Sequence, residues 1–315
     1  MKKLLCVLLA LTLLVGATAL AEWPERSIEL IVPANPGGDT DSNARALAAA
    51  LNEELGWNVI VSNMSGGSGA VAFEDLMNNP DDGYRFVFYH SGACITQLMG
   101  MYDFNVLDDY KLAGMVFMDY SSAFLMNSKN DKFSDLASMV AYMKDHPGEV
   151  SFATETGSFT HLHALAFEEA AGVKFNIVDA GTAAQKITEL LGQRLDLIDT
   201  QAGLVRDYLD TKEFTCLGVM SDERLEGRPE VPTLKEQGYD IVFPKFFYLA
   251  APNSVDDSVI AALNAGLSKV IESESLKAYA GTALLNVTSM SPEEAEAYYA
   301  EQCDVYAGYL ADYIE

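Results

Sequence analysis

Short apolar runs alternate along the chain with segments in which apolar residues recur every three or four positions. The first apolar run is Ile28–Val32, and the turn residues that flank it predict a buried strand. Residues 33–38 follow, and their prolines and glycines disfavour both helix and strand. The next segment has apolar residues at helical spacing and ends at Gly56, which predicts a helix with a glycine cap. Strand, glycine loop and helix therefore form one unit.

The same order recurs along the rest of the chain. Further strands are predicted at residues 59–61, 84–89, 150–154, 175–178, 195–198 and 246–251, and further helices at residues 70–77, 133–144 and 158–172 and in a segment ending at Leu191. Residues 80–83 predict a turn. Strands that alternate with helices predict an α/β protein with mostly parallel sheets and right-handed crossovers. In such sheets, ligands bind at the carboxyl ends of the strands.

The last predicted helix begins with a capping box. Ser291 is the expected cap, Pro292 occupies the first helical position, and Glu294 follows three residues after the cap. The apolar stripe of this helix consists of Ala295, Tyr299, Cys303, Tyr306, Leu310 and Tyr313. Such a stripe implies that the helix docks on the body of the protein.

The first residues have the pattern of a secretory signal. Lys2 and Lys3 precede an apolar stretch that gives way to small residues ending at Ala21, so cleavage is expected there and residues 1–21 are expected to be removed. The stretch is shorter than the about 20 apolar residues of a membrane span. Cys6 lies inside it, which does not support lipidation. The mature chain is therefore expected to be exported and soluble.

The mature chain is long enough for two hydrophobic cores. About 294 residues remain after the signal, above the size at which one core stops growing. We expect one lobe from residues 22–122 plus 246–315 and a second from residues 123–245. The chain would cross between the lobes near residues 120–127 and 246–251, and these two crossings would form a hinge.

The charge balance excludes one class of partner. The chain has 20 basic and 46 acidic residues, and removing the two signal lysines leaves 18 − 46 = −28. Nucleic acid is not an expected partner, because binding it requires clusters of Lys and Arg. An acidic surface of this kind keeps a secreted protein soluble.

Three cysteines remain in the mature chain, Cys94, Cys216 and Cys303. They lie far apart and in no CxxC pair, so neither a zinc site nor a redox motif is expected. At most one disulfide can form, and Cys94 with Cys303 is the pair to test. Three buried free thiols are the preferred expectation.

The strongest candidate site is the loop at residues 36–41. Its glycines allow backbone amides to approach a ligand, and the helix start behind them favours an anion such as a carboxylate. The alternative is that Asp39 or Asp41 only caps the helix. The glycine run at residues 65–69 matches neither nucleotide-binding pattern and is interpreted as a tight turn that lines the cleft.

A second candidate anion site lies in the other half of the chain. Gly157 and Ser158 precede the helix that carries His161 and His163. Ser158 is equally explained as a plain N-cap. The two histidines are two positions apart, so they point to different helix faces and cannot share a metal. No metal and no cofactor are expected.

Two further groups of residues require separate interpretation. Ser91 and Ser68 are candidate nucleophiles, but neither lies in a G-x-S-x-G motif, so an exported serine hydrolase is only an alternative from a different class. Residues 246–248 are aromatic and alternate along a strand, so one or two of them, Phe247 among them, are expected to reach the cleft. Core packing is the usual fate of such side chains.

At these residues the chain resembles the Bug-type extracytoplasmic receptors, the substrate-binding components of tripartite tricarboxylate transporters. The matching segments are residues 23–24, 28–33, 36–38 with Asp41 and Arg45, Asn63 with its glycine run, 82–84, 157–158 with His161, 190–192 with Asp196 and Asp199, 231–233 with Gly238, and 250–252. The resemblance covers essentially the whole mature chain. It implies a two-lobed type II periplasmic-binding-protein fold in which loops of opposing lobes hold a ligand carboxylate.

The resemblance places the gripping loops at Ala34 to Gly38 and at Thr156 to Ser158. Taken together with the motifs above, the candidate ligand-binding residues are Ala34, Asn35, Pro36, Gly37, Gly38, Asp41, Asn63, Ser91, Gly92, Ala93, Thr156, Gly157, Ser158, His161, Ala180, Gly181, Asp199 and Phe247.

Two positions and one short segment depart from the family pattern. Asn35 and Ser65 stand where the family usually has proline, and residues 179–181 replace a common tyrosine-lysine-glycine segment. Asp179 would repel a second carboxylate or attract an amine. The cleft loops are poor in arginine, which leaves no obvious salt bridge for a tricarboxylate.

The expected protein is a monomeric, non-enzymatic solute receptor. It would capture a small carboxylate-bearing ligand and deliver it to a transporter with one large and one small membrane subunit. The alternative within the same class is a receptor for an amino acid or another amine-bearing solute, favoured by Asp179 and Asp199.

Overall fold

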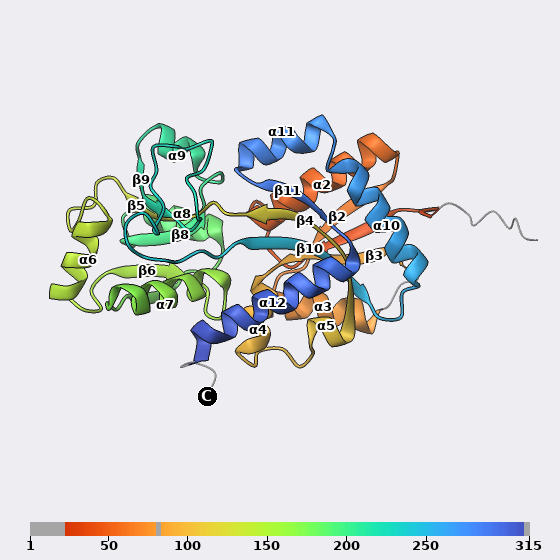
Figure 1. The fold of residues 1–315 in the computed structure, drawn as a ribbon, viewed down its shortest axis with the longest axis horizontal. Helices are drawn as coiled ribbons and strands as arrows, with labels where there is room; N and C mark the ends of the chain where they lie inside the picture. Colours follow the sequence, from red (N-terminus) through yellow and green to blue (C-terminus); the bar gives the residue numbers. More distant parts are fainter. Residues whose placement is uncertain (1–22, 80–82, 312–315) are drawn as a thin grey trace, which may run out of the picture.

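The protein is built on two β-sheets, seen side by side in the computed structural model (Figure 1). The structure describes residues 23–79 and 83–311, so the expected signal peptide, most of the predicted turn at 80–83 and Tyr313 lie outside the described residues. We call the part built on the first sheet lobe 1 and the part built on the second sheet lobe 2. No helix within the described residues has the length and apolarity needed to cross a membrane.

Lobe 1 contains a six-stranded sheet in the order β11-β4-β10-β3-β1-β2. Its strands are β1 (Ile28–Val32), β2 (Val59–Asn63), β3 (Arg85–His90), β4 (Tyr110–Asp119), β10 (Lys245–Pro252) and β11 (Asn286–Met290). Its helices are α2 (Asp39–Leu55), α3 (Ala70–Asn78), α4 (Gly92–Leu98), α5 (Val106–Asp109), α10 (Asp257–Val270), α11 (Glu274–Ala283) and α12 (Pro292–Leu310), with a 3₁₀ turn at Gly67–Gly69.

Lobe 2 contains a five-stranded sheet in the order β7-β6-β8-β5-β9. Its strands are β5 (Ser122–Asn127), β6 (Ser151–Thr154), β7 (Asn176–Asp179), β8 (Leu197–Gln201) and β9 (Phe214–Val219). Its helices are α6 (Leu136–Asp145), α7 (Phe159–Ala171), α8 (Ala183–Leu191) and α9 (Arg206–Asp210).

The α/β class is confirmed, but both sheets are mixed rather than mostly parallel in their pairings. In lobe 1, β1 pairs in parallel with β2 and β3, whereas β10 pairs antiparallel with β3 and β4. In lobe 2, β5 pairs antiparallel with β8 and β9. β5 and β10, which follow the two crossings between the lobes, are antiparallel to both of their neighbours, and the edge strand β11 also pairs antiparallel with β4. Local sequence pattern does not reveal the direction of such a strand.

The chain changes sheet at two places. The mostly apolar stretch at residues 113–126 is divided between β4, which ends at Asp119, and β5, which begins at Ser122. The return crossing enters lobe 1 at Lys245, the first residue of β10. The first crossing, at residues 120–121, lies at the start of the predicted range, and the return crossing lies just before residue 246.

Helix α12 joins the two lobes along one side of the molecule (Figure 1). Its predicted capping box is present, with Glu294 N donating to Ser291 Oγ at 3.2 Å and Ser291 N donating to Glu294 Oε2 at 2.8 Å. Tyr299 and Tyr306 are buried, and the Tyr306 ring lies 5.9 Å from the ring of Phe159 in lobe 2. The helix therefore docks as expected and contacts both lobes.

The expectation of three free thiols is wrong. Cys94 on α4 and Cys303 on α12 form a disulfide, and Cys216 is the one free cysteine among the described residues. The two bonded residues are 209 positions apart in sequence. Their pairing depends on the docking of α12 against α4, which local sequence pattern does not reveal.

Candidate functional site

A cavity of about 430 Å³ lies between the two lobes. It is lined by the loops that follow β1, β3, β6 and β7, by the end of β8 and by the residues at both crossings. Its position matches the rule that ligands bind at the carboxyl ends of strands. The lining residues are Pro33, Ala34, Asn35, Gly38, Asp39, Thr40, Ser65, Gly66, Ser68, Tyr89, His90, Gly92, Thr96, Asp119, Ser122, Glu155, Ser158, Phe159, Thr160, Asp179, Gly181, Thr182, Ala183, Gln185, Lys186, Thr200, Gln201 and Lys245.

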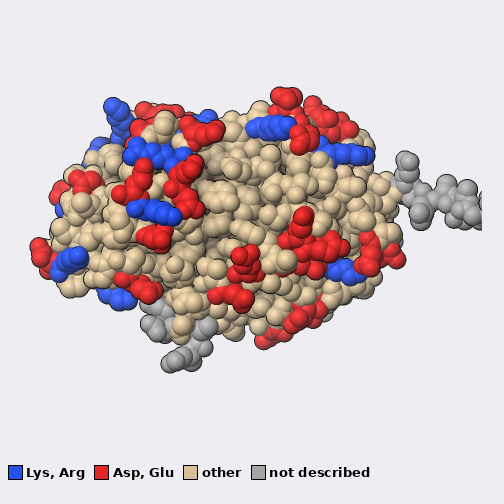
Figure 2. Space-filling view, viewed as in Figure 1, with Lys and Arg blue, Asp and Glu red and all other residues tan. Residues whose placement is uncertain are grey.

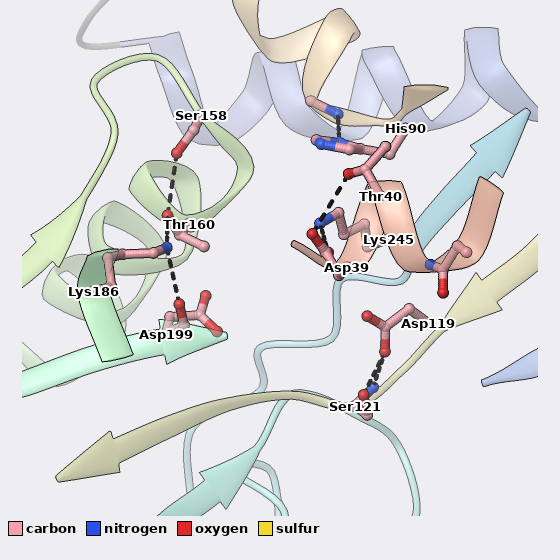
Figure 3. A network of polar contacts seen from close by, with 12 residues as sticks. Asp39, Thr40, His90, Asp119, Ser121, Ser158, Thr160, Lys186, Asp199 and Lys245 are labelled. Atoms are coloured by element: carbon pink, nitrogen blue, oxygen red, sulfur yellow. Dashed lines mark hydrogen bonds and ion pairs between the residues drawn. The ribbon is translucent and has the colours of Figure 1, made fainter. Parts of the chain in front are cut away.

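The lobe 1 wall contains a lysine that is already paired. Lys245 Nζ forms a short ion pair with Asp39, and the two side chains are only 13% and 15% exposed (Figure 3). Burial by itself would raise the pKa of Asp39, but the Lys245 ammonium more than offsets this effect and holds that pKa well below its usual range. The positive charge of Lys245 is therefore neutralised within the protein.

The loop before α2 is held from behind by its own side chains. Asp41 accepts hydrogen bonds from Gly37 N at 3.0 Å and from Arg45 Nε at 3.1 Å. Asn63 Nδ2 donates to Asp41 Oδ1 at 2.9 Å and to Ala34 O at 3.0 Å. Asp41 and Asn63 thus shape the cavity wall without forming part of its surface.

The glycine turn after β2 contributes to the same wall, as the sequence predicts. Ser65, Gly66 and Ser68 line the cavity. Gly69 has a φ of +106°, and a Cβ at this position would lie 2.8 Å from atoms of Tyr89 and Tyr102. Glycine is therefore required here for both conformation and space.

The lobe 2 wall contains a lysine with a different environment. Lys186 on α8 is 5% exposed, and its Nζ donates to Thr160 Oγ1 at 3.2 Å and to the backbone oxygen of Asp199 at 3.0 Å (Figure 3). Among the described residues no carboxylate lies within 4.0 Å of this ammonium group. Burial lowers the pKa of Lys186. The hydrogen-bond partners of this ammonium group are neutral oxygen atoms, and the Asp199 carboxylate attracts it without direct contact.

The amides of the lobe 2 loop at residues 155–158 bond within their own lobe. Gly157 N donates to His161 Nδ1 at 3.2 Å, and Thr156 N donates to Asp179 Oδ2 at 3.4 Å. Ser158 is the N-cap of α7 and accepts from His161 N at 3.4 Å. The N-cap alternative is therefore correct for Ser158, although this residue also lines the cavity.

The crossing from β4 to β5 places an unpaired acid on the wall. Asp119 Oδ1 accepts from Ser121 N at 2.7 Å and from Ser121 Oγ at 2.6 Å, while its Oδ2 has no hydrogen-bond partner among the described residues. Burial raises the pKa of Asp119 to about 6. Gln201, at the end of β8, is 5% exposed and has a similarly unpartnered Nε2. This corner of the cavity therefore presents one free acceptor and one free donor.

His90 adds a neutral group to the same wall. Its Nδ1 accepts a hydrogen bond from Gly92 N at 2.9 Å, so the ring proton belongs on Nε2. Burial, together with the nearby Lys245 ammonium, holds the pKa of His90 well below its usual range. The ring is therefore neutral at physiological pH.

The lobes also touch each other beside the cavity. Ser68 Oγ of lobe 1 donates to Glu155 Oε1 of lobe 2 at 3.3 Å. Thr96 Oγ1 of lobe 1 donates to Gly157 O of lobe 2 at 3.3 Å. These contacts join the two walls in the conformation described.

The cavity wall includes only some of the candidate residues from the sequence. Ala34, Asn35, Gly38, Gly92, Ser158 and Gly181 line it. Nine candidates belong to the adjoining elements or loops but do not line it, and these are Pro36, Gly37, Asp41, Asn63, Ala93, Thr156, Gly157, His161 and Ala180.

Three further candidates face the core, which corrects the sequence expectation. Ser91 is fully buried and does not line the cavity. Phe247 packs against Phe88 with ring centroids 5.7 Å apart, because β10 is an inner strand with both faces covered. Asp199 directs its Oδ2 to His163 Nδ1 in a short, fully buried hydrogen bond. Only the backbone oxygen of Asp199 contributes to the site, through Lys186.

The sequence reasoning missed Lys186, Lys245, Asp119 and Gln201 as site residues. A signal existed for Lys186, because it lies four positions before the buried Leu190 on the inward face of α8. A signal also existed for Lys245, the charged residue at the start of a predicted crossing strand. Neither signal by itself distinguishes a cavity wall from a core.

Charges on the outer surface contribute little to binding in the cavity. Acidic side chains are spread over both lobes on the face shown, with lysines and arginines among them (Figure 2). Such surface charges are screened beyond about 8 Å at physiological salt, so the cavity groups dominate binding.

Among the described residues no group of three or more His, Cys, Asp or Glu side chains is arranged to hold a metal ion.

Two α/β lobes that enclose a polar cavity at their strand ends define a solute-binding protein with the type II periplasmic fold. The sequence model of the tripartite tricarboxylate transporter family receptors matches residues 43–306, and the chain belongs to this family. It is a family of periplasmic solute receptors rather than enzymes, which agrees with the burial of Ser91.

Individual relatives agree with this assignment. BugT of Bordetella pertussis is 29% identical over 296 residues, which cover 92% of this chain and 90% of BugT. A Rhodopseudomonas palustris protein solved with adipate has a TM-score of 0.86 and 22% identity, covering 92% of this chain and 98% of that chain. A second protein from the same organism, solved with malate, has a TM-score of 0.82 and 20% identity, covering 93% and 100%. The two structures show the shared fold.

Proposed function

We propose that the protein captures a small carboxylate-bearing molecule in the interlobe cavity and delivers it to a membrane transporter of the tripartite tricarboxylate type. The observation that carries the proposal is the buried, ion-unpaired ammonium group of Lys186 on the cavity wall. The protein acts outside the cytoplasm after cleavage near Ala21, as a monomer, with one large and one small membrane subunit as its partners.

The energetics of Lys186 favour an anionic ligand. A buried charge is costly unless it is paired, and hydrogen bonds to a hydroxyl and a carbonyl provide only part of the compensation. A ligand carboxylate in the cavity would complete the pair. A charge-assisted hydrogen bond in a site closed to water is stronger than a neutral one. The two similar structures that contain adipate and malate hold carboxylates of a size suited to such a cavity.

The arrangement of the walls suggests how capture leads to delivery. Lys186 belongs to lobe 2, whereas the loop at residues 34–38 belongs to lobe 1. A ligand that contacts both walls stabilises the closed arrangement over an open one, and only this difference in affinity can shift the equilibrium. The transporter would then recognise the closed, loaded protein.

The test is a titration of the purified mature protein with a panel of carboxylates, sugars and amines. We expect carboxylates to bind, and Lys186→Met to weaken them at least about 30-fold, since removing one partner of a buried charge pair costs about 2 kcal/mol or more. Lys269→Met, at an exposed position on α10, is the matched control and should bind like the parent protein. A panel in which only sugars or cations bind, or an unchanged Lys186→Met, contradicts the proposal.

Delivery requires a separate measurement. Uptake of the bound solute by vesicles that contain the two membrane subunits should depend on added receptor. Uptake at the same rate without the receptor would contradict this part of the proposal.

A further inference from the structure

The negative groups of the cavity call for an explanation beyond carboxylate binding. Four carboxylates line the wall, Asp39, Asp119, Glu155 and Asp179, against two ammonium groups, Lys186 and Lys245. Asp39 and Lys245 neutralise each other. The remaining wall has more negative than positive charge, so a ligand with carboxylates alone meets repulsion as well as attraction.

Asp119 has the most unusual environment of the four acids. It is fully buried, and its Oδ2 has no hydrogen-bond partner among the described residues. A buried carboxylate oxygen without a donor is costly, so such a group in a cavity wall calls for a donor from the occupant. The two surface-nearer acids already accept hydrogen bonds, Glu155 from Ser68 Oγ and Asp179 from Thr156 N.

Lys186 and Asp119 lie on opposite sides of the cavity. Lys186 is on α8 of lobe 2, and Asp119 is at the end of β4 beside the crossing between the lobes (Figure 3). One presents a charge that lacks an anion, and the other presents an acceptor that lacks a donor. Gln201 Nε2, also on the wall and unpartnered, can donate to a ligand oxygen.

We propose that the natural ligand is an amine-bearing carboxylic acid, with its carboxylate at Lys186 and its ammonium group at Asp119 Oδ2. This inference rests on the proposed function and adds to it a second charged group of the ligand, the ammonium group. A zwitterion satisfies both unpaired groups at once and adds no net negative charge to an acidic wall. Asp119, rather than Asp199, is the amine-binding acid, because Asp119 lines the cavity, whereas Asp199 does not and directs its Oδ2 to His163.

The test compares ligands that share a carbon skeleton and differ in one substituent. Glutarate, 2-hydroxyglutarate and glutamate form one set, and pentanoate and 5-aminopentanoate form another, measured by calorimetry at pH 7.5. In at least one set the amine-bearing member should bind about tenfold tighter than its unsubstituted partner, which corresponds to ~1.4 kcal/mol. If neither amine-bearing member binds tighter, or if 2-hydroxyglutarate binds as tightly as glutamate where that set shows the gain, the inference is overturned.

Two variants assign the effect to a residue. Asp119→Asn should abolish the preference for the amine while changing the affinity for the unsubstituted acid less than about threefold. Asp179→Asn, which changes the exposed acid on the same wall, should retain the preference. Loss of the preference in Asp179→Asn alone would move the amine to that residue and overturn the assignment.

The outcomes separate this inference from the proposed function. If carboxylic acids bind and depend on Lys186 but show no gain from an amine, the proposed function stands and the zwitterion inference fails. If no carboxylic acid binds and Lys186→Met has no effect, both fail. Thermal unfolding of Asp119→Asn in one cooperative transition, at or above the midpoint of the parent protein, shows that the variant is folded.

Discussion

The two walls of the cavity each contain a buried lysine, and the two lysines differ in what surrounds them. Lys245 in lobe 1 has a carboxylate partner, Asp39, whereas Lys186 in lobe 2 has a hydroxyl and a backbone carbonyl. Both residues are lysines and both are largely shielded from solvent, so neither property predicts a role in binding. The difference lies in charge compensation. A compensated charge stabilises the wall, and an uncompensated charge is available to a ligand.

The comparison predicts its largest effect on stability. Lys245→Met should lower the free energy of unfolding by about 3–5 kcal/mol, because it leaves Asp39 buried without its partner. Lys186→Met should be neutral or stabilising in the ligand-free protein, because it removes a buried charge that lacks a counterion. Urea unfolding of the two variants measures both effects.

The double variant Asp39→Asn/Lys245→Met provides the control for that experiment. It should recover most of the lost stability, since it removes both charges. Equal destabilisation by the two single lysine variants would show that the presence or absence of a carboxylate partner does not affect the free energy of unfolding.

We expect Asp119, at the crossing between the lobes, to make the free energy of unfolding depend on pH, and this effect should be of intermediate size. Burial raises the pKa of Asp119 to about 6, helped by Asp39 and opposed by Ser121 and Lys245. The native state therefore binds more protons than the unfolded state between about pH 4 and 6, and the contribution of Asp119 to stability falls as pH rises through 6. Relative to Asp119→Asn, the ligand-free parent protein should lose roughly 1–3 kcal/mol between pH 4 and 7.5.

Unfolding free energies of the two proteins across this pH range measure the effect. Because other carboxylates titrate over the same range in both proteins, only the difference between the two curves is interpreted. A difference that does not change with pH would mean that Asp119 keeps the pKa of an exposed carboxyl.

Removing the Asp39 carboxylate from lobe 1 should give each wall an ammonium group without a carboxylate partner. Asp39→Asn leaves Lys245 without its anion, so the cavity then contains two unpaired ammonium groups. A dicarboxylate such as adipate should gain about tenfold in affinity, while a monocarboxylate such as pentanoate should gain less. Calorimetric titration of both acids against the variant tests this. Equal gains for the two acids would indicate a general change in the electrostatic potential of the cavity rather than binding of a second carboxylate at Lys245.

The smallest predicted effect concerns the direct contact between the lobes. Ser68→Ala removes the 3.3 Å hydrogen bond to Glu155, a partly exposed interaction. Because a single hydrogen bond of this kind contributes about 0.5–1.5 kcal/mol at most, ligand affinity should fall less than about tenfold. Affinity measured for Ser68→Ala and for Thr96→Val shows whether such contacts add to closure. A loss as large as that of Lys186→Met would mean that closure, rather than charge, governs binding.

Local features of this protein are determined by its sequence. The strand at Ile28–Val32, the glycine turn after it, the Gly56 cap and the capping box at Ser291 all appear where the pattern predicts them. Each depends on residues within a few positions of one another, whose conformational preferences and hydrogen bonds are readable in order. The two-lobed class follows from their alternation and length.

The chemistry of the cavity was decided only by the tertiary structure. The pairing of Asp39 with Lys245 joins residues 206 positions apart, and the disulfide joins Cys94 to Cys303 over 209 positions. The sequence places Asp199 in the site, yet folding turns its carboxylate toward His163 and brings Asp119 to the wall instead. Whether a buried charge has a partner depends on atoms brought together from distant segments, and no local pattern contains that information.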